Sequence, residues 1–188
     1  MENFQRIEDF IEEKLNNDAY AIICIDGSCG SGKSTYAKYL EEKYPIDLIQ
    51  MDDFFLPFEL KTEARLATEG GNIHHERFSE EIVPILFSTE EKSYQSYNCK
   101  TRTYEKKYLK GHKVKVIEGV YSSHPIFGDI YDYKISLSID SLLQKERIIS
   151  RNGLEMWGKF EAQWIPLEEY YFNFFNTFKT SDLHIHIQ

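Results

Sequence analysis

Residues 27–35, Gly-Ser-Cys-Gly-Ser-Gly-Lys-Ser-Thr, carry the pattern of a phosphate-binding loop, in which a glycine and four further residues precede Gly-Lys-Ser. An apolar run of strand length, residues 19–26, comes before the loop, and residues 36–40 carry apolar side chains at helical spacing that ends near Pro45. A strand, a glycine turn and a helix N-terminus make a site for anions, because backbone N–H groups and the helix dipole both favour negative charge. The residues expected to hold the phosphates are Gly27, Ser28, Cys29, Gly30, Ser31, Gly32, Lys33, Ser34 and Thr35.

Three side chains of this loop invite separate predictions. Lys33 is expected to reach the β- and γ-phosphates of a nucleotide, and the Ser34 hydroxyl to hold Mg²⁺. Cys29 lies near a helix N-terminus that can lower the pKa of a thiol. We interpret it as a small residue tolerated in the loop, because reactivity also requires exposure. Whether Cys29 responds to oxidants is left open by the sequence.

The bulk composition limits the class of protein. The 188 residues are expected to form one domain with a substantial core, and the net charge of −9 argues against a nucleic-acid partner, which requires a cationic surface. The sequence lacks an apolar run of membrane-spanning length, and its acidic N-terminus does not have the form of a signal peptide. Three cysteines without paired metal spacing favour neither disulfides nor zinc. We therefore expect a cytoplasmic protein that does not bind membranes; association into a homo-oligomer remains open.

Predicted strands and helices alternate along the chain, which indicates an α/β fold with a mostly parallel sheet. We expect one domain over residues 1–188, a lid over about residues 145–160, and an acceptor-side insertion over about residues 54–110. Within that insertion, residues 56–77 are expected to form a loop and residues 92–109 a β-hairpin. The predicted strands cover residues 19–26, 46–51, 114–118, 133–139 and 183–187. The predicted helices cover residues 4–15, 36–44, 78–87, 141–150 and 160–178, and the aromatic side chains of the last are expected to pack in the core.

Acidic residues follow two of these strands. In parallel sheets the ligand lies beyond the carboxyl ends of the strands, so the ends are where function is expected. Asp52 and Asp53 follow the strand at residues 46–51, and Asp52 is expected to orient an acceptor hydroxyl and accept its proton. Glu118 ends the strand at residues 114–118, where a carboxylate can hold Mg²⁺ or its waters.

Arg147 and Arg151 lie four residues apart in the helix predicted at residues 141–150, so they share a face. Near the Asn152-Gly153 step, such a pair is suited to a lid that closes over the nucleotide and neutralises transition-state charge. A solvated basic helix end explains the same residues equally well.

Three motifs, at residues 27–35, 51–55 (Met-Asp-Asp-Phe-Phe) and 117–121 (Ile-Glu-Gly-Val-Tyr), together resemble the uridine kinase and phosphoribulokinase-like family of P-loop small-molecule kinases. The resemblance extends over about residues 19–187. The Asp-Asp-Phe-Phe step and the Trp-Ile-Pro segment at residues 164–166 also resemble nicotinamide riboside kinases.

The resemblance implies ATP or GTP as phosphoryl donor, Mg²⁺ as cofactor, and a small-molecule acceptor. It implies that Asp52 is the catalytic base, that Lys33 clamps the phosphates, and that Ser34 and Glu118 serve the metal. By the same match Arg147 and Arg151 are lid arginines. The residues expected to contact the acceptor are Asp53, Phe55, His74, His75, Tyr97, Arg102 and Tyr121.

The sequence departs from uridine kinases at two places. His74 stands where those enzymes have a nucleoside-binding acid, and Arg102 lies near the position of a histidine in their hairpin segment. Loss of the acid weakens a hydroxyl contact, so specificity for uridine is not expected, whereas the kinase chemistry is unaffected. We expect phosphoryl transfer to a hydroxyl of a nucleoside or similar metabolite. The alternatives are nicotinamide riboside, pantothenate or a sugar phosphate as acceptor, or a regulatory module that hydrolyses ATP without an acceptor.

Overall fold

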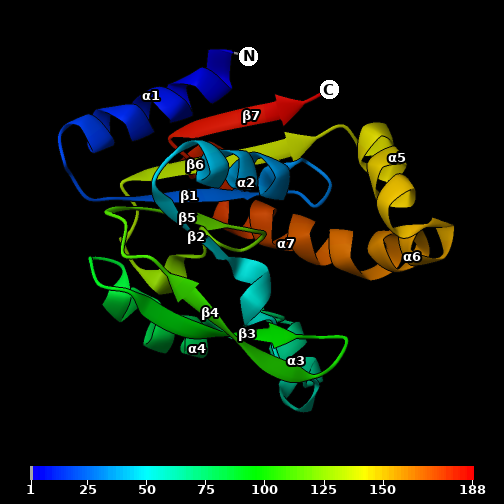
Figure 1. The fold of residues 1–188 in the computed structure, drawn as a ribbon. Coiled ribbons are helices and arrows are strands. Elements are labelled where there is room, and N and C mark those ends of the chain that lie inside the picture. Colours follow the sequence, from blue (N-terminus) through cyan, green and yellow to red (C-terminus); the bar gives the residue numbers. More distant parts are fainter. Residues whose placement is uncertain (1) are drawn as a thin grey trace.

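The computed structural model describes residues 2–188, and a five-stranded sheet forms its centre (Figure 1). The strands lie in the order β2-β5-β1-β6-β7, and every neighbouring pair is parallel. The α/β fold expected from the alternation of elements is therefore confirmed. The bounds of the strands are β1 Ala21–Gly27, β2 Ile46–Gln50, β5 Val114–Glu118, β6 Tyr133–Ile139 and β7 Leu183–Ile187.

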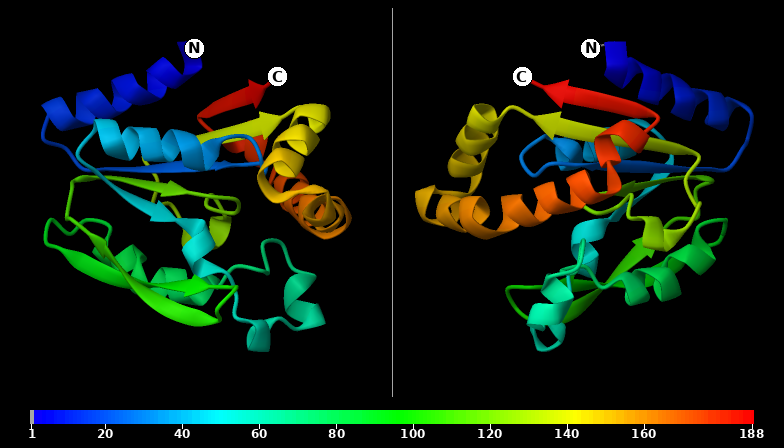
Figure 2. Two further views of the ribbon diagram at one scale, coloured as in Figure 1. Left: turned by 45° about the vertical axis from the view of Figure 1, so that its right-hand side comes forward. Right: turned by 180° about the vertical axis from the view of Figure 1, so that it is seen from behind.

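Helices cover both faces of this sheet (Figure 2). The amphipathic helix α1 (Glu2–Asn16) and the helix after the phosphate loop, α2 (Lys33–Lys43), pack on one face. Helix α7 (Ile165–Phe175) packs on the other face through Tyr171 and Phe172. The central strands β1 and β5 are therefore buried on both sides, whereas His184 and His186 of the edge strand β7 are exposed.

The register of the sheet brings the carboxyl ends of its central strands together. Ile25 of β1 pairs with Glu118 of β5, which also pairs with Gln50 of β2. The phosphate loop leaves β1 two residues later, and Asp52 follows β2 directly. Parallel pairing thus places the loop and both acidic strand ends at one edge of the sheet.

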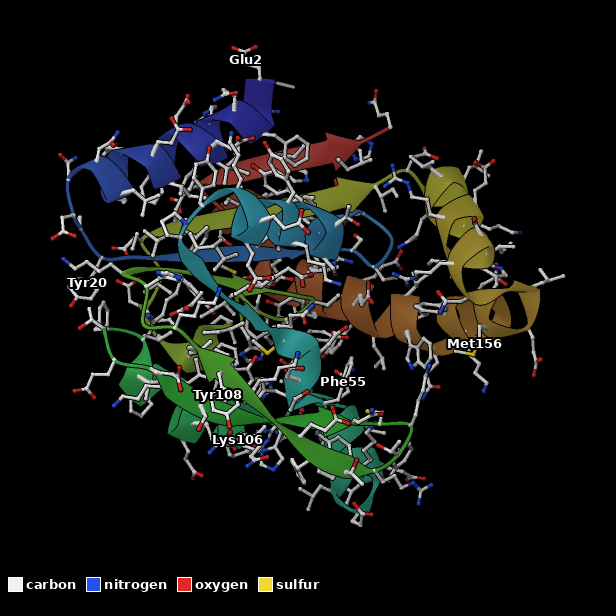
Figure 3. All side chains as sticks on the ribbon, viewed as in Figure 1. Glu2, Tyr20, Phe55, Lys106, Tyr108 and Met156 are labelled. Carbon is white, nitrogen blue, oxygen red and sulfur yellow. The ribbon has the colours of Figure 1, made fainter. Side chains whose placement is uncertain are left out.

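A separate antiparallel hairpin lies beside the sheet and is formed by β3 (Lys92–Asn98) and β4 (Thr103–Leu109). The prediction of a hairpin over residues 92–109 is confirmed. Tyr94 and Leu109 turn inward to join the core under the main sheet, whereas Tyr108 is 61% exposed on the outer side. Figure 3 labels Tyr108 and Lys106 on this hairpin.

The expectation of an unstructured loop over residues 56–77 is wrong, because this segment contains short helices. A 3-10 turn at Phe58–Leu60 is followed by α3 (Glu63–Leu66), whose N-terminus is capped by the Thr62 hydroxyl at 3.1 Å from the Arg65 nitrogen. The arginine side chain then donates to the carbonyls of Gly71 and Ile73 and closes the segment on itself.

Two predicted helices are shorter than expected, one because of a proline and the other because of a residue in the left-handed conformation. The helix expected at residues 78–87 is α4 (His75–Glu81), followed by a 3-10 turn at Val83–Ile85, since Pro84 lacks the N–H that a longer α-helix needs. The helix expected at residues 160–178 begins as a π-helical turn, Phe160–Trp164, ahead of Pro166 in α7. It ends at Asn176, whose φ of 52° starts the short helix α8 (Thr177–Thr180).

The helix expected at residues 141–150 is α5 (Ser141–Asn152), which is two residues longer than predicted, and its N-terminus is capped by the Asp140 carboxylate. Helix α6 (Leu154–Lys159) follows it after Gly153, whose φ of 85° turns the chain. These two helices project from the sheet at the edge that carries the phosphate loop (Figure 1). They form the element expected as a lid.

Candidate active site

The phosphate loop has a conformation that only glycine tolerates at several positions. Gly30 and Gly32 have φ angles of 78° and 97°. A Cβ atom on Gly27 would lie 2.0 Å from the carbonyl oxygen of Leu137, so the loop also depends on close approach to β6. Lys33 is buried, and its Nζ donates to the Ser28 carbonyl at 3.0 Å. The ammonium group thus lies across the loop, where a phosphate group would be enclosed.

A further observation is consistent with a nucleoside triphosphate as the ligand of this loop. The Ser31 hydroxyl is buried and has no hydrogen-bond partner among residues 2–188. Such an orphaned donor is uncommon in a folded protein and points to a missing ligand oxygen. A Cβ on Gly32 would meet only an Arg147 nitrogen, at 3.9 Å, so the space over the loop is bounded by the lid.

Ser34 and Glu118 come together as the metal prediction requires. The Ser34 hydroxyl donates to a Glu118 carboxylate oxygen at 2.9 Å. Burial raises the pKa of Glu118, and the Lys33 ammonium opposes that rise. Residues 2–188 contain no cluster of three His, Cys, Asp or Glu side chains able to enclose a metal. A magnesium ion here would therefore take Ser34, Glu118, water and phosphate oxygens, the pattern that Mg²⁺ prefers.

Asp52 opens onto the same space from the end of β2. Its side chain is exposed by area, yet protein surrounds it on enough sides that desolvation raises its pKa. Lys33 again opposes this rise, while Asp53 adds to it. One buried ammonium group thus serves both Asp52 and Glu118, which places all three side chains around a single volume beyond the sheet.

Asp53 is not available to a substrate, contrary to expectation. Its side chain is buried, and both of its oxygens bind Lys107 Nζ, at 2.8 and 2.9 Å. The hydroxyls of Tyr94 and Ser96 donate to the same carboxylate at 2.7 and 2.5 Å. The Arg77 guanidinium binds the carbonyls of Asp53 and of a hairpin residue. Asp53 therefore fastens the hairpin to the chain immediately beside Asp52.

A pocket of about 360 Å³ lies between Asp52 and the hairpin. The Tyr97 hydroxyl, whose side chain is one wall of this pocket, is buried without a hydrogen-bond partner among residues 2–188. Figure 3 labels Phe55, which follows β2 and lines the same pocket. The complete lining is Asp52, Phe55, Ser96, Tyr97, Asn98, Cys99, Lys100 and Glu105.

Arg102 lies at the hairpin turn, where its φ of 57° is unusual for a residue with a side chain. Its guanidinium stacks on the Phe58 ring with 4.7 Å to the ring centre. It does not line the pocket but stands beside Lys100, which does. The structure thus brings Phe55 and Tyr97 to the pocket and Arg102 to its neighbourhood.

The other residues expected to contact the acceptor lie behind the pocket. His74 accepts from the Arg77 nitrogen at 3.1 Å and caps α4. The buried His75 ring packs on that of His124 with centroids 4.6 Å apart, and burial lowers its pKa to about 4. Tyr121 is 3% exposed and has a φ of 72°. None of the three side chains lines the pocket, so their expected contact with an acceptor finds no support in this geometry.

The lid contacts the phosphate loop through one of the two expected arginines. Arg147 donates to the Gly30 carbonyl at 3.1 Å, whereas Arg151 binds the neighbouring Asn152 side chain at 2.7 Å. Ile148, Trp157 and Phe160 form a small apolar cluster inside the lid. Figure 3 labels Met156 in this element. Helices α5 and α6 contain most of residues 145–160, and their role as a lid stays a prediction.

The surroundings of Cys29 bear on the reactivity of its thiol. Burial raises the pKa of its thiol, and the nearby Glu168 carboxylate raises it further. Its backbone N–H donates to that carboxylate at 2.8 Å. A thiol held protonated in this way is a poor nucleophile.

Sequence reasoning missed two acids at this site. Asp26 ends β1 and accepts five hydrogen bonds, from residues 27, 121, 123 and 171. The strand-end rule that singled out Asp52 and Glu118 applies equally to this residue. Glu168 lies in the aromatic helix α7, and no motif in the sequence distinguishes it from the acids around it.

Comparisons with known proteins identify the fold. A scan against protein-family models and a search of curated protein sequences find no match. A solved structure of a possible uridine kinase from Bacillus stearothermophilus has a TM-score of 0.70 at 18% identity, covering 98% of this chain and 100% of that one. A protein from Silicibacter described as a candidate fructose transport system kinase has a TM-score of 0.67 at 19% identity and covers 89% of this chain and 90% of its own.

A third solved structure, from Saccharomyces cerevisiae, is described as a candidate P-loop kinase with a circular permutation. It has a TM-score of 0.70 at 13% identity and covers 99% of each chain. The parallel sheet, the phosphate loop and the flanking helices therefore define the fold of P-loop kinases. This agrees with the uridine kinase-like resemblance read from the sequence motifs.

Proposed function

We propose that this protein is a kinase that transfers a phosphoryl group from Mg-ATP, or Mg-GTP, to a hydroxyl of a nucleoside or similar small metabolite. The observation that carries the proposal is the placement of Asp52 between the buried ammonium of Lys33 and a pocket with an unpartnered tyrosine hydroxyl. The neighbours described as kinases for uridine and for a fructose transport system support the same class of reaction.

Each group of the site has a role in this reaction. Bound nucleotide supplies the phosphoryl group, and its phosphates would lie against the loop amides, Lys33 and the Ser31 hydroxyl. Ser34 and Glu118 would hold Mg²⁺. Asp52 orients the acceptor hydroxyl and accepts its proton, and its raised pKa brings it closer to the working pH of a general base. Arg147 closes over the loop and excludes water.

The experiment that tests the proposal measures ADP release from Mg-ATP against uridine, cytidine, nicotinamide riboside, pantothenate and several sugar phosphates, with a control lacking acceptor. Stimulation by one compound supports a kinase and identifies its acceptor. Asp52→Asn is expected to keep nucleotide binding and to lose about 10²-fold or more in turnover. Asp129→Asn, at an exposed position away from the loop, is the matched control. Full turnover in Asp52→Asn would refute the assignment of the base.

A second candidate is an acceptor that carries a carboxylate or phosphate. Lys61 and Arg102 each lie 4.7 Å from the centre of the Phe58 ring, and Lys100 lines the adjacent pocket. None of these three cations forms an ion pair with an acidic side chain within residues 2–188, although the chain is strongly acidic. Glu105 lines the same pocket and opposes an anion, so Lys100 and Arg102 would have to outweigh it.

The acceptor panel separates these candidates. Turnover with pantothenate or a sugar phosphate that falls in Arg102→Ala by a rise in KM favours the anionic acceptor. Turnover with a neutral nucleoside, unchanged in Arg102→Ala, favours the first candidate. ADP release that no acceptor stimulates favours the slow ATPase module instead.

Among residues 2–188, every helix is too short or too polar to span a lipid bilayer.

A further inference from the structure

An acidic side chain lies against the loop that is expected to bind phosphate. Glu168 in α7 is 7% exposed, and its Oε2 accepts from the backbone nitrogen of Cys29 at 2.8 Å. A carboxylate is an unexpected neighbour for a loop whose amides attract anions, because an incoming phosphate would be repelled. None of the roles described above uses this side chain.

The same residue of the loop is held from the opposite side. Gln144 in α5 donates its Nε2 to the Cys29 carbonyl at 2.9 Å, and its side chain is also buried. One turn further along α5, Arg147 donates to the carbonyl of Gly30. The N–H of Cys29 is therefore bound by a side chain of α7, and its C=O by a side chain of the lid helix α5.

Apolar contacts reinforce these hydrogen bonds. Cys29 packs against the lid cluster of Ile148, Trp157 and Phe160. A Cβ on Gly30 would lie 3.5 Å from Ile148, so the loop and α5 are already in close contact. The lid and this turn of the phosphate loop consequently form one packed unit, and the Glu168 carboxylate accepts the Cys29 N–H within it.

We propose that Glu168 is a positioning residue, which fixes the Cys29 turn of the phosphate loop against the lid and takes up a proton when nucleotide binds. The inference rests on the proposed function, because it requires that the loop binds a nucleotide. The proton goes from solvent to the carboxylate, forming an O–H bond, and no other bond changes. The neutral carboxyl keeps one oxygen free to accept from Cys29 while its repulsion of the phosphates disappears.

The surroundings of Glu168 favour this behaviour. Burial raises the pKa of its carboxyl to about 7, with Lys33 and the bond from Cys29 opposing the rise and Asp26 adding to it. The other titratable groups that face this region are Tyr121 from the segment after β5 and Arg151 from α5. Phosphates placed on the loop would raise the carboxyl pKa further, so binding should take up protons near neutral pH. Nucleotide affinity should then weaken as pH rises through that range.

The test is calorimetric titration of the full chain with Mg-ADP between pH 6 and pH 8.5. The variant is Glu168→Gln, which keeps an oxygen for the Cys29 N–H and cannot ionise. Glu169→Gln, at the exposed neighbouring position, is the matched control. For wild type and the control, Kd should rise as the pH increases, by up to about tenfold for each unit by which the bound phosphates raise the pKa of Glu168. Glu168→Gln should show a nearly flat profile after the titration of ADP itself, common to all three proteins, is subtracted.

Two further measurements make the result decisive. Proton uptake is read from the binding enthalpy in buffers of different ionisation enthalpy, and it should vanish in Glu168→Gln. If that variant does not fold, Gln144→Met removes the bond from the other side and should keep the pH dependence while weakening affinity. Binding with equal pH dependence in wild type and Glu168→Gln would overturn the inference and leave the proposed function intact. Absence of nucleotide binding in wild type would refute the proposed function itself.

Discussion

Replacing Asp26 by asparagine tests how strongly one buried carboxylate stabilises the site. Its Oδ1 accepts from the backbone nitrogens of Gly27 and Tyr121, at 2.6 and 3.1 Å. Its Oδ2 accepts from the nitrogen and hydroxyl of Ser123, at 3.0 and 2.6 Å, and from the Tyr171 hydroxyl at 2.8 Å. The side chain is fully buried, so water cannot replace a lost partner.

The geometry fixes what asparagine can keep. Its NH₂ group is tolerated best at the Oδ2 position, because the hydroxyls of Ser123 and Tyr171 can rotate and accept. The Ser123 N–H then faces another donor and loses its partner, which costs about 1–3 kcal/mol. The remaining bonds lose their charge assistance, which roughly doubles the strength of such bonds. We expect Asp26→Asn to lower the free energy of unfolding by about 2–4 kcal/mol in total.

Thermal unfolding followed by circular dichroism measures this loss. A domain of this size is expected to lose about 2–4 °C in Tm for each kcal/mol, so the expected decrease is roughly 5–15 °C. Asp129→Asn makes the same chemical change at an exposed position and should leave Tm within about 1 °C of wild type. A decrease below about 2 °C in Asp26→Asn would show that the carboxylate is not needed to hold these five donors.

Three further predictions concern the hairpin, the lid and the base. Lys107→Met leaves the carboxylate of Asp53 without its cation, so the hairpin should be held less firmly. The KM for the acceptor should then rise by a larger factor than kcat falls. An unchanged KM would contradict the anchoring role of Lys107. Asp140→Ala removes the cap of α5 and should cost about 1 kcal/mol in urea denaturation, a value that a matched Ser141→Ala control should not reproduce. Because the pKa of Asp52 is raised, kcat/KM should fall as the pH falls through a value above about 4, the ordinary pKa of an aspartate. A pH profile of kcat/KM that falls only at or below that value would argue against Asp52 as the base.

The parts of the site that follow from local rules were predictable from the sequence. The phosphate loop, the strand-end position of Asp52 and the pairing of Ser34 with Glu118 depend on short motifs and on parallel topology, and the structure has the same arrangement. The same motifs carry the resemblance to known kinases, and this resemblance predicted the α/β fold correctly. What these residues bind remains a prediction.

The rest depends on contacts between distant segments. Asp53 was expected to contact the acceptor, but it is buried whereas Asp52 is exposed, and only the fold brings Lys107 to it. Glu168 lies 139 residues from Cys29 along the chain, and its role depends on how α7 packs. Helix ends were missed where Pro84 and the left-handed Asn176 interrupt apolar patterns that continue past them.

The anchoring of the hairpin has a consequence for how a protein of this fold can diversify. Lys107, Tyr94 and Ser96 hold the base of the hairpin to Asp53, whereas the pocket is lined mainly by residues around its turn. The turn can therefore be exchanged for another sequence without moving the residue that precedes Asp53. A library that randomises residues 98–102 and keeps the three anchors should yield folded variants. If the proposed kinase function holds, these variants should differ in acceptor preference, because residues 98–100 line the pocket while the position of Asp52 is unchanged.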